Sequence, residues 1–235
     1  MSCSLHASRR LRVADWLCRA CCMGKGTEMI DPDRFEYMRA RLKERVKPSR
    51  YMHSLGVSQT AEQLARIYGA NENDAAVAGL LHDWDKALPA SELKRIAKKH
   101  HLAPKTVRKS MPGVLHALTA PRSLRKEFPE LSDEVLQAIE RHTCGAADMS
   151  DLDMIVFIAD IIEPGRTFVD VAPLRAAVGQ VDLDELFYMT YKSTLIYLLD
   201  ADMSIHPDSL EVWNDIVSQR ALRMEACKPR VIVIE

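Results

Sequence analysis

The amino-acid sequence predicts an all-α protein, a bundle of helices around a buried central site. From Asp31 onward, apolar residues recur every three or four positions, the spacing that gives a helix one buried face. Residues that terminate helices follow these segments, as Gly69 follows the apolar pattern of 50–68. Strand character is confined to the segment V-I-V-I at 231–234, which is too short to form a sheet alone.

The helices are predicted in order from their caps and spacing. The first opens with Asp31 as N-cap and Pro32 in the first turn, followed by Phe35, Met38 and Leu42 at helical spacing. The same criteria predict further helices at 50–68, 73–85, 91–101 behind a Ser91 cap, 113–127, 133–143, 151–163, 173–180, 183–202 and 208–226.

Composition and charge exclude several classes of protein. The chain has 235 residues, 47% of them hydrophobic, which suffices to bury a core of ordinary size. A formal charge of −1 removes the bulk attraction that non-specific binding to nucleic acid or acidic membranes requires. The longest apolar run, Met154 to Ile162, is broken by Asp160 and falls short of the roughly 18 residues that a membrane span needs. We therefore expect no nucleic-acid or membrane partner.

We expect one compact domain at 29–227, flanked by an extension at 1–28 and a tail at 228–235. Asp15 and Arg19 interrupt what would be the apolar core of a signal peptide, so we expect a cytoplasmic protein. Cys18 and Cys21 have C-x-x-C spacing, but no second pair follows, which favours a frayed extension over a zinc site. Met29 lies directly before the first predicted helix, so we expect the native protein to start there. The apolar tail could pad a homodimer interface or form a disordered end.

Four histidines and two aspartates suggest a metal site. The histidines His53, His82, His116 and His142 all lie in amphipathic helical segments. Asp83 directly follows His82, and Asp160 is the one charge in an apolar run, where an ionised carboxylate must be paired or bound to metal. Imidazole and carboxylate ligands suit zinc, iron, cobalt or manganese, and the absence of cysteine argues against a zinc finger.

Six ligands exceed the need of one tetrahedral ion, and a bridging carboxylate would allow two metals. Such a pair favours hydrolysis of phosphoesters or phosphoanhydrides. Cationic side chains stand at helical spacing for this chemistry: Lys86 three residues after Asp83, Arg50 three before His53, and Arg166 beyond Glu163. A basic run at 94–109 is interpreted either as a solvated face or as a rim that steers phosphates.

Longer motifs resemble a known family. The sequences R-Y-M-H-S-L-G-V at 50–57, A-G-L-L-H-D-W-D-K at 78–86, R-H-T-C-G at 141–145, I-A-D-I-I-E-P-G-R at 158–166 and I-H-P-D-S-L-E-V-W-N at 205–214 are similar to the YqeK group of HD-domain phosphohydrolases. The likeness spans residues 31 to 215. It implies an HD-domain helical bundle with a buried dinuclear metal site.

The resemblance also implies an activity: symmetrical hydrolysis of diadenosine tetraphosphate to two ADP, with two divalent or trivalent transition-metal ions. Iron is expected, with manganese, cobalt or zinc as alternatives. The implied metal ligands are His53, His82, Asp83 and Asp160 for the first ion, and Asp83, His116 and His142 for the second. The expected catalytic residues are Asp83, Lys86 and Arg166, and the expected substrate-binding residues are Arg50, Lys86, Glu163 and Arg166. Glu163 would orient a ligand or Arg166.

Two positions depart from the family pattern. The stretch V-L-H-A-L-T-A-P-R around His116 lacks the glycine usual in the family, so His116 is the ligand whose surroundings differ. Asp85 stands where a small residue is common; it would add negative charge near a polyanion, pair with Lys86 or bind a metal-bound water. The sequence is also consistent with three other hypotheses about function: another HD-domain nucleotidase or nucleoside-polyphosphate hydrolase, a non-catalytic nucleotide-binding domain, and a helical scaffold with structural histidines.

Overall fold

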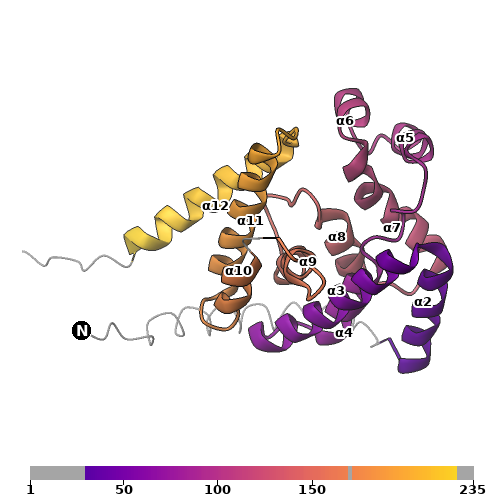
Figure 1. Cartoon of the computed structure of the whole chain (residues 1–235), viewed down its shortest axis with the longest axis horizontal. Coiled ribbons are helices and arrows are strands. Elements are labelled where there is room, and N and C mark those ends of the chain that lie inside the picture. The colour runs from indigo at the N-terminus through magenta and orange to yellow at the C-terminus, as the bar shows by residue number, and fades with distance from the viewer. Residues whose placement is uncertain (1–29, 169–170, 227–235) are drawn as a thin grey trace, which may run out of the picture.

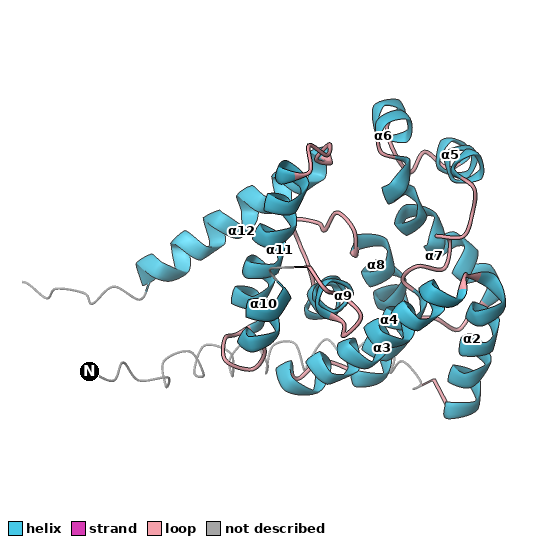
Figure 2. Cartoon of the chain, in the orientation of Figure 1, coloured by secondary structure: helices cyan, strands magenta, loops and turns pink. Residues whose placement is uncertain are grey.

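The computed structural model describes residues 30–168 and 171–226, and every regular element within these residues is helical (Figures 1 and 2). The predicted all-α class is confirmed. The C-x-x-C pair, the native start at Met29 and the tail at 231–234 lie outside the described residues.

The first described helix, α2 (Pro32–Arg45), begins as its sequence predicts. The Asp31 carboxylate accepts a hydrogen bond from the Arg34 amide at 2.9 Å, and Pro32 occupies the first turn, where no intrahelical donor is needed. Met38 and Leu42 are fully buried against the rest of the bundle.

Helices α3 (Pro48–Tyr68) and α4 (Glu72–Leu81) cross at very short range. A Cβ added at Gly79 would lie 2.9 Å from the Ser58 Cα, so only glycine permits this approach. Helix α3 ends at Gly69, whose φ of +80° is the left-handed conformation that glycine favours.

The prediction of one continuous helix at 73–85 was wrong. Helix α4 stops at Leu81, and residues 82–87 form consecutive tight turns, in which Trp84 bonds back to Leu81 and Lys86 to Asp83. Hydrophobic spacing cannot separate such turns from a helix, because both bring residues three apart close together. The turns carry three of the predicted site residues: His82, Asp83 and Lys86.

The middle of the chain holds α5 (Ala90–Lys99), α6 (Lys105–Ser110), a 3₁₀ turn at Pro112–Val114 and α7 (Leu115–Glu127). The predicted Ser91 cap is wrong, because Pro89 precedes α5 and no side chain caps it. Helix α6 was not predicted. Most side chains of the basic run at 94–109 are exposed, which fits a solvated face.

The remaining helices are α8 (Asp133–Arg141), α9 (Asp151–Ile162), α10 (Val171–Ala177), α11 (Leu183–Asp200) and α12 (Pro207–Ala226). Helix α9 lies between the two halves of the bundle in Figure 1. Its apolar side chains join both large buried clusters, for example Ile155 with α3 and α11, and Val156 with α4 and α8. Asp160 is the polar exception near its C-terminal end.

Candidate metal centre

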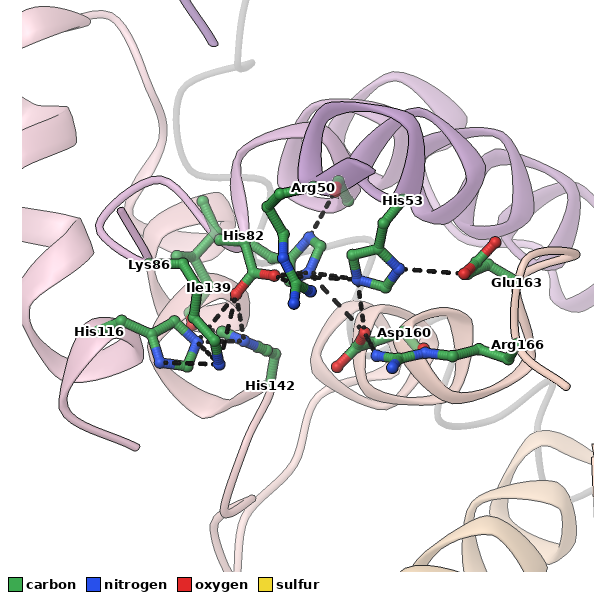
Figure 3. Close-up of polar contacts among 12 residues, drawn as sticks. Arg50, His53, His82, Lys86, His116, Ile139, His142, Asp160, Glu163 and Arg166 are labelled. Atoms are coloured by element: carbon green, nitrogen blue, oxygen red, sulfur yellow. Dashed lines mark hydrogen bonds and ion pairs between the residues drawn. The ribbon is translucent and has the colours of Figure 1, made fainter. Parts of the chain in front are cut away.

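The six predicted metal ligands come together from five parts of the fold (Figure 3). His53 lies on α3, His82 and Asp83 directly after α4, His116 on α7, His142 directly after α8, and Asp160 on α9. Their ligand atoms form three overlapping groups, each within 4.8 Å: His53, His82 and Asp83; His82, His142 and Asp160; and Asp83, His116 and His142.

Three of the histidines are oriented in the same way. The Nδ1 of each ring lies 2.6–2.7 Å from the carbonyl oxygen three residues earlier: Gly79 for His82, Gly113 for His116 and Ile139 for His142. Nδ1 therefore donates, and in the neutral ring Nε2 carries a lone pair. These carbonyls were not predicted from the sequence, although each lies three residues before its histidine.

The fourth histidine, His53, is held by a buried carboxylate instead. Glu163 Oε1 lies 3.0 Å from His53 Nδ1, and its Oε2 accepts from the Gly165 amide at 2.5 Å. Gly56 and Gly165 leave room for this carboxylate, because a Cβ at either position would lie within 3 Å of its oxygens. Of the two predicted roles for Glu163, the contacts favour orientation of a ligand, since the Arg166 guanidinium contacts Asp160 instead.

The four Nε2 atoms point at one another and at the two aspartates. His53 and His82 approach to 3.3 Å, and His116 and His142 to 3.2 Å, through nitrogens that have no proton to share. Lone pairs and carboxylates at such distances repel, unless a cation lies between them. The donor set therefore fits metal ions, and each of the four histidines has the supporting hydrogen bond that metal-binding histidines require.

Asp83 stands at the middle of the cluster, with its two oxygens facing different histidines. Oδ2 lies 3.2 Å from His82 Nε2 and 3.8 Å from His53 Nε2. Oδ1 lies 3.0 Å from His116 Nε2 and 4.0 Å from His142 Nε2. This division matches what a carboxylate shared between two ions requires. The altered sequence around His116 has not moved this histidine away from the cluster.

Three cationic side chains border the cluster. Arg50 donates to Asp83 Oδ2 at 2.8 Å, and Arg166 donates to Asp160 Oδ1 at 2.6 Å. Lys86 Nζ lies 4.0 Å from Asp83 Oδ1 and 3.4 Å from His116 Nδ1. The predicted residues Arg50, Lys86 and Arg166 are thus all brought to the site.

These charges shift the proton affinities. Burial opposes the charged form of Asp83, but the neighbouring imidazoles of His82 and His116 outweigh it and hold its pKa below the ordinary range. Asp160 shows the same balance: burial opposes its charged form, but the contact with His53 and the nearby Arg166 guanidinium outweigh burial and lower its pKa. Burial and two adjacent imidazoles lower the pKa of His142 to about 3. Burial also lowers the pKa of Lys86.

The expectation for Asp85 was wrong. Its carboxylate is fully buried and points away from the cluster, where it accepts from Arg45 Nη2 at 2.7 Å and from Ser123 Oγ at 2.9 Å. The tight turns after α4 place Asp83 and Asp85 on opposite sides, so Asp85 adds no charge beside a bound polyanion and does not pair with Lys86. It joins α2 to α7 instead.

A helical bundle around a buried His/Asp cluster is the class that the fold and the site define. The HD domain family model matches residues 50–165, which include all six candidate ligands. A solved structure from Clostridium acetobutylicum, described as a predicted HD superfamily hydrolase involved in NAD metabolism, is similar with a TM-score of 0.72 and 34% identity, covering 79% of this chain and 97% of that one.

Two curated relatives make the relationship more specific. Proteins named bis(5'-nucleosyl)-tetraphosphatase, symmetrical, are 30% identical over 76% of this chain in Bacillus subtilis and 32% identical over 84% in Halalkalibacterium halodurans. The matches cover 95% and 98% of those proteins. The chain belongs to the HD-domain family, in the group of these symmetrical tetraphosphatases. Among the described residues, no helix is long and apolar enough to cross a membrane.

Proposed function

We propose that this protein is a metal-dependent phosphohydrolase that cleaves diadenosine tetraphosphate symmetrically into two ADP. The observation that carries the proposal is the position of Asp83, whose two oxygens face two different pairs of histidines. A cluster built for two ions suits phosphoanhydride hydrolysis. The names of the relatives supply the substrate class.

The ligands are assigned to two ions. His53, His82, Asp83 and Asp160 would hold the first, and Asp83, His116 and His142 would hold the second. When bound, such a pair polarises a phosphoryl oxygen and lowers the pKa of a water molecule. The metals expected are transition metals with iron first, and manganese, cobalt or zinc as alternatives that also suit imidazole and carboxylate ligands.

Hydrolysis adds one water across one P–O bond. The water oxygen bonds to a phosphorus beside the central bridging oxygen, the bond to that oxygen breaks, and both products are ADP. Lys86, Arg50 and Arg166 neutralise the tetraphosphate, because phosphoryl transfer depends on electrostatic stabilisation of the spread charge. Lys86 is the best placed for the substrate, since the other two already hold ligand carboxylates. Glu163 acts on the substrate only through His53, because its own carboxylate is buried.

Product analysis tests the proposal. Metal-loaded protein is incubated with diadenosine tetraphosphate, and the nucleotides are separated. We expect ADP alone from the unmodified protein and from Asp33→Asn, which alters an exposed carboxylate on α2. Asp83→Asn should abolish turnover and reduce bound metal. ATP plus AMP would contradict symmetrical cleavage, and turnover of other nucleotides only would move the assignment to another nucleotidase activity.

A further inference from the structure

The segment 162–166, at the end of α9, carries two side chains that hold candidate metal ligands. The Glu163 carboxylate contacts His53 Nδ1, and the Arg166 guanidinium donates to Asp160 Oδ1. Both side chains point from this segment towards the cluster (Figure 3). Because both contacts are short, a shift of the segment would move the supports of two ligands of the first ion, although the segment contributes no ligand itself.

Pro164 ends α9 and leaves backbone carbonyls without their helical donors. Pro164 has no N–H group to donate to Asp160, and Arg166 Nε donates to the Asp160 carbonyl instead, at 2.8 Å. In a continuing helix the Arg166 amide would donate to Ile162, but here it bonds to the Glu163 carbonyl at 2.9 Å. The Ile162 carbonyl therefore depends on a donor from another part of the chain.

Arg175 on α10 supplies that donor and two more. Its Nε donates to the Ile162 carbonyl at 2.8 Å. Its Nη2 donates to the Glu163 carbonyl and, at 3.0 Å, to the Arg166 carbonyl. One planar guanidinium thus binds three carbonyls of the same segment. The fixed fork of N–H groups on arginine makes this possible, whereas the single ammonium group of lysine lacks such a fork.

The hydrophobic core holds the helix that carries Arg175. Val171 and Leu174 on α10 are buried, and they belong to the cluster that contains side chains of α3, α9 and α11. Leu174 directly precedes Arg175, so the guanidinium extends from a well-packed point of the fold. Its three hydrogen bonds therefore tie the segment 162–166 to that core.

We infer that Arg175 is a positioning residue for the metal centre. It fixes the segment 162–166, whose two side chains hold His53 and Asp160 in place for the first ion. The inference rests on the proposed function for the assignment of ligands to two ions, and it does not depend on the identity of the substrate.

The second ion provides an internal reference. Its ligands His116 and His142 are oriented by the carbonyls of Gly113 and Ile139, which lie in other parts of the fold. Loss of the Arg175 guanidinium should therefore weaken binding of the first ion and leave the second unchanged. An arginine that only stabilised the end of α9 would behave differently, because unfolding releases both ions together.

Titration of the metal-free protein with Mn²⁺, followed by calorimetry, tests the inference, with urea unfolding measured in parallel. Arg175→Met keeps an apolar stem and removes the donors, and Arg175→Lys keeps the charge. Arg125→Met is the matched control, because Arg125 also donates to a backbone carbonyl, that of Leu131, and lies at the other end of α7 from His116. Asp160→Asn and His116→Ala identify which measured affinity belongs to which ion.

The expected result is selective for one ion. Arg175→Met should weaken the affinity for the first ion about tenfold, at the low end of what groups that orient metal ligands contribute. The affinity for the second ion, and both affinities of Arg125→Met, should stay within about twofold of those of the unmodified protein. Arg175→Lys should lose less than Arg175→Met, because it retains a charged donor near the carbonyls.

Two results would overturn the inference. One is an unchanged affinity for the first ion in Arg175→Met, and the other is an equal loss for both ions with a lower free energy of unfolding, which would mean that Arg175 only stabilises the fold. If Arg175→Met does not fold, the same comparison of the two ions in Arg175→Lys decides.

Failure of the proposed function is seen separately, in the product analysis. The unmodified protein could release no ADP from diadenosine tetraphosphate while Arg175→Met selectively loses affinity for the first ion. That combination would refute the proposed activity and support the positioning role of Arg175.

Discussion

Glu163→Gln should weaken metal binding although the side chain keeps its size. The carboxylate of Glu163 accepts from two donors, His53 Nδ1 at 3.0 Å and the Gly165 amide at 2.5 Å. A glutamine has only one oxygen, so its NH₂ group would face one of these two N–H groups. The change also removes the negative charge that makes the His53 ring a stronger base and fixes its direction.

The expected magnitude follows from these two losses. Partners that orient a metal-binding histidine are typically worth about 10–100-fold in metal affinity, which is roughly 1.4–2.8 kcal/mol. Because Glu163 is buried, the unsatisfied donor should also cost about 1–3 kcal/mol of folding stability. Both effects should appear without any change in helix content, since Glu163 follows the last residue of α9.

The assay is a titration of metal-free protein with Fe²⁺ or Mn²⁺ under anaerobic conditions, with urea unfolding measured in parallel. Glu62→Gln is the matched control, because Glu62 lies on α3 as His53 does and pairs only with the exposed Arg66. An affinity within twofold of that of the unmodified protein would refute the argument that Glu163 supports His53. So would an equal loss in Glu62→Gln.

Three further outcomes are expected. Asp85→Ala should lower the free energy of unfolding by about 2–3 kcal/mol, because it leaves the partly buried Arg45 without its carboxylate partner. Turnover per folded molecule should stay unchanged. Chemical denaturation measures the first effect, and a rate assay measures the second. Gly79→Ala should lower the free energy of unfolding by about 1–3 kcal/mol and reduce the bound metal, because the new Cβ would meet the α3 backbone. Gly113→Ala is the control, since a Cβ there would have nothing within 4 Å and should change neither quantity. Thermal unfolding and metal content measure both effects. Burial raises the pKa of the Cys144 thiol to about 11, so the thiol stays protonated at pH 8 and should escape alkylation in the native protein. Peptide mass spectrometry measures the rate of modification. A rate equal to that in the unfolded protein would contradict this expectation.

Much of the fold could be predicted from the sequence because most helices carry their own signals. The start of α2 needed only Asp31 and Pro32, and the end of α3 needed only Gly69. The end of α4 could not be found in this way. Tight turns preserve the three-residue spacing of apolar and polar positions, so no local pattern distinguishes residues 82–87 from another helical turn.

The residue types of the candidate site could also be predicted, because a charged Asp160 within an apolar helix requires a partner. Its supporting contacts could not. The bond from Glu163 to His53 spans 110 residues, and the bond from Arg45 to Asp85 spans 40. Such pairs depend on how helices cross, which the spacing along one helix does not specify. The same limit explains why Asp85 was expected beside a polyanion, Lys86 or a metal-bound water, because its partner Arg45 lies on another helix.

The segment where α4 ends brings the cluster together. The His82 ring is held by the Gly79 carbonyl, and the Asp83 carboxylate next to it reaches histidines from α3, α7 and the end of α8. Gly79 contributes to both the helix crossing and the metal centre. Its lack of a side chain lets α3 pack closely against α4, and its carbonyl orients the His82 ring. The close crossing of α3 and α4 and the geometry of the metal centre are therefore one structural feature, and a change that separates the two helices should affect stability and metal affinity together.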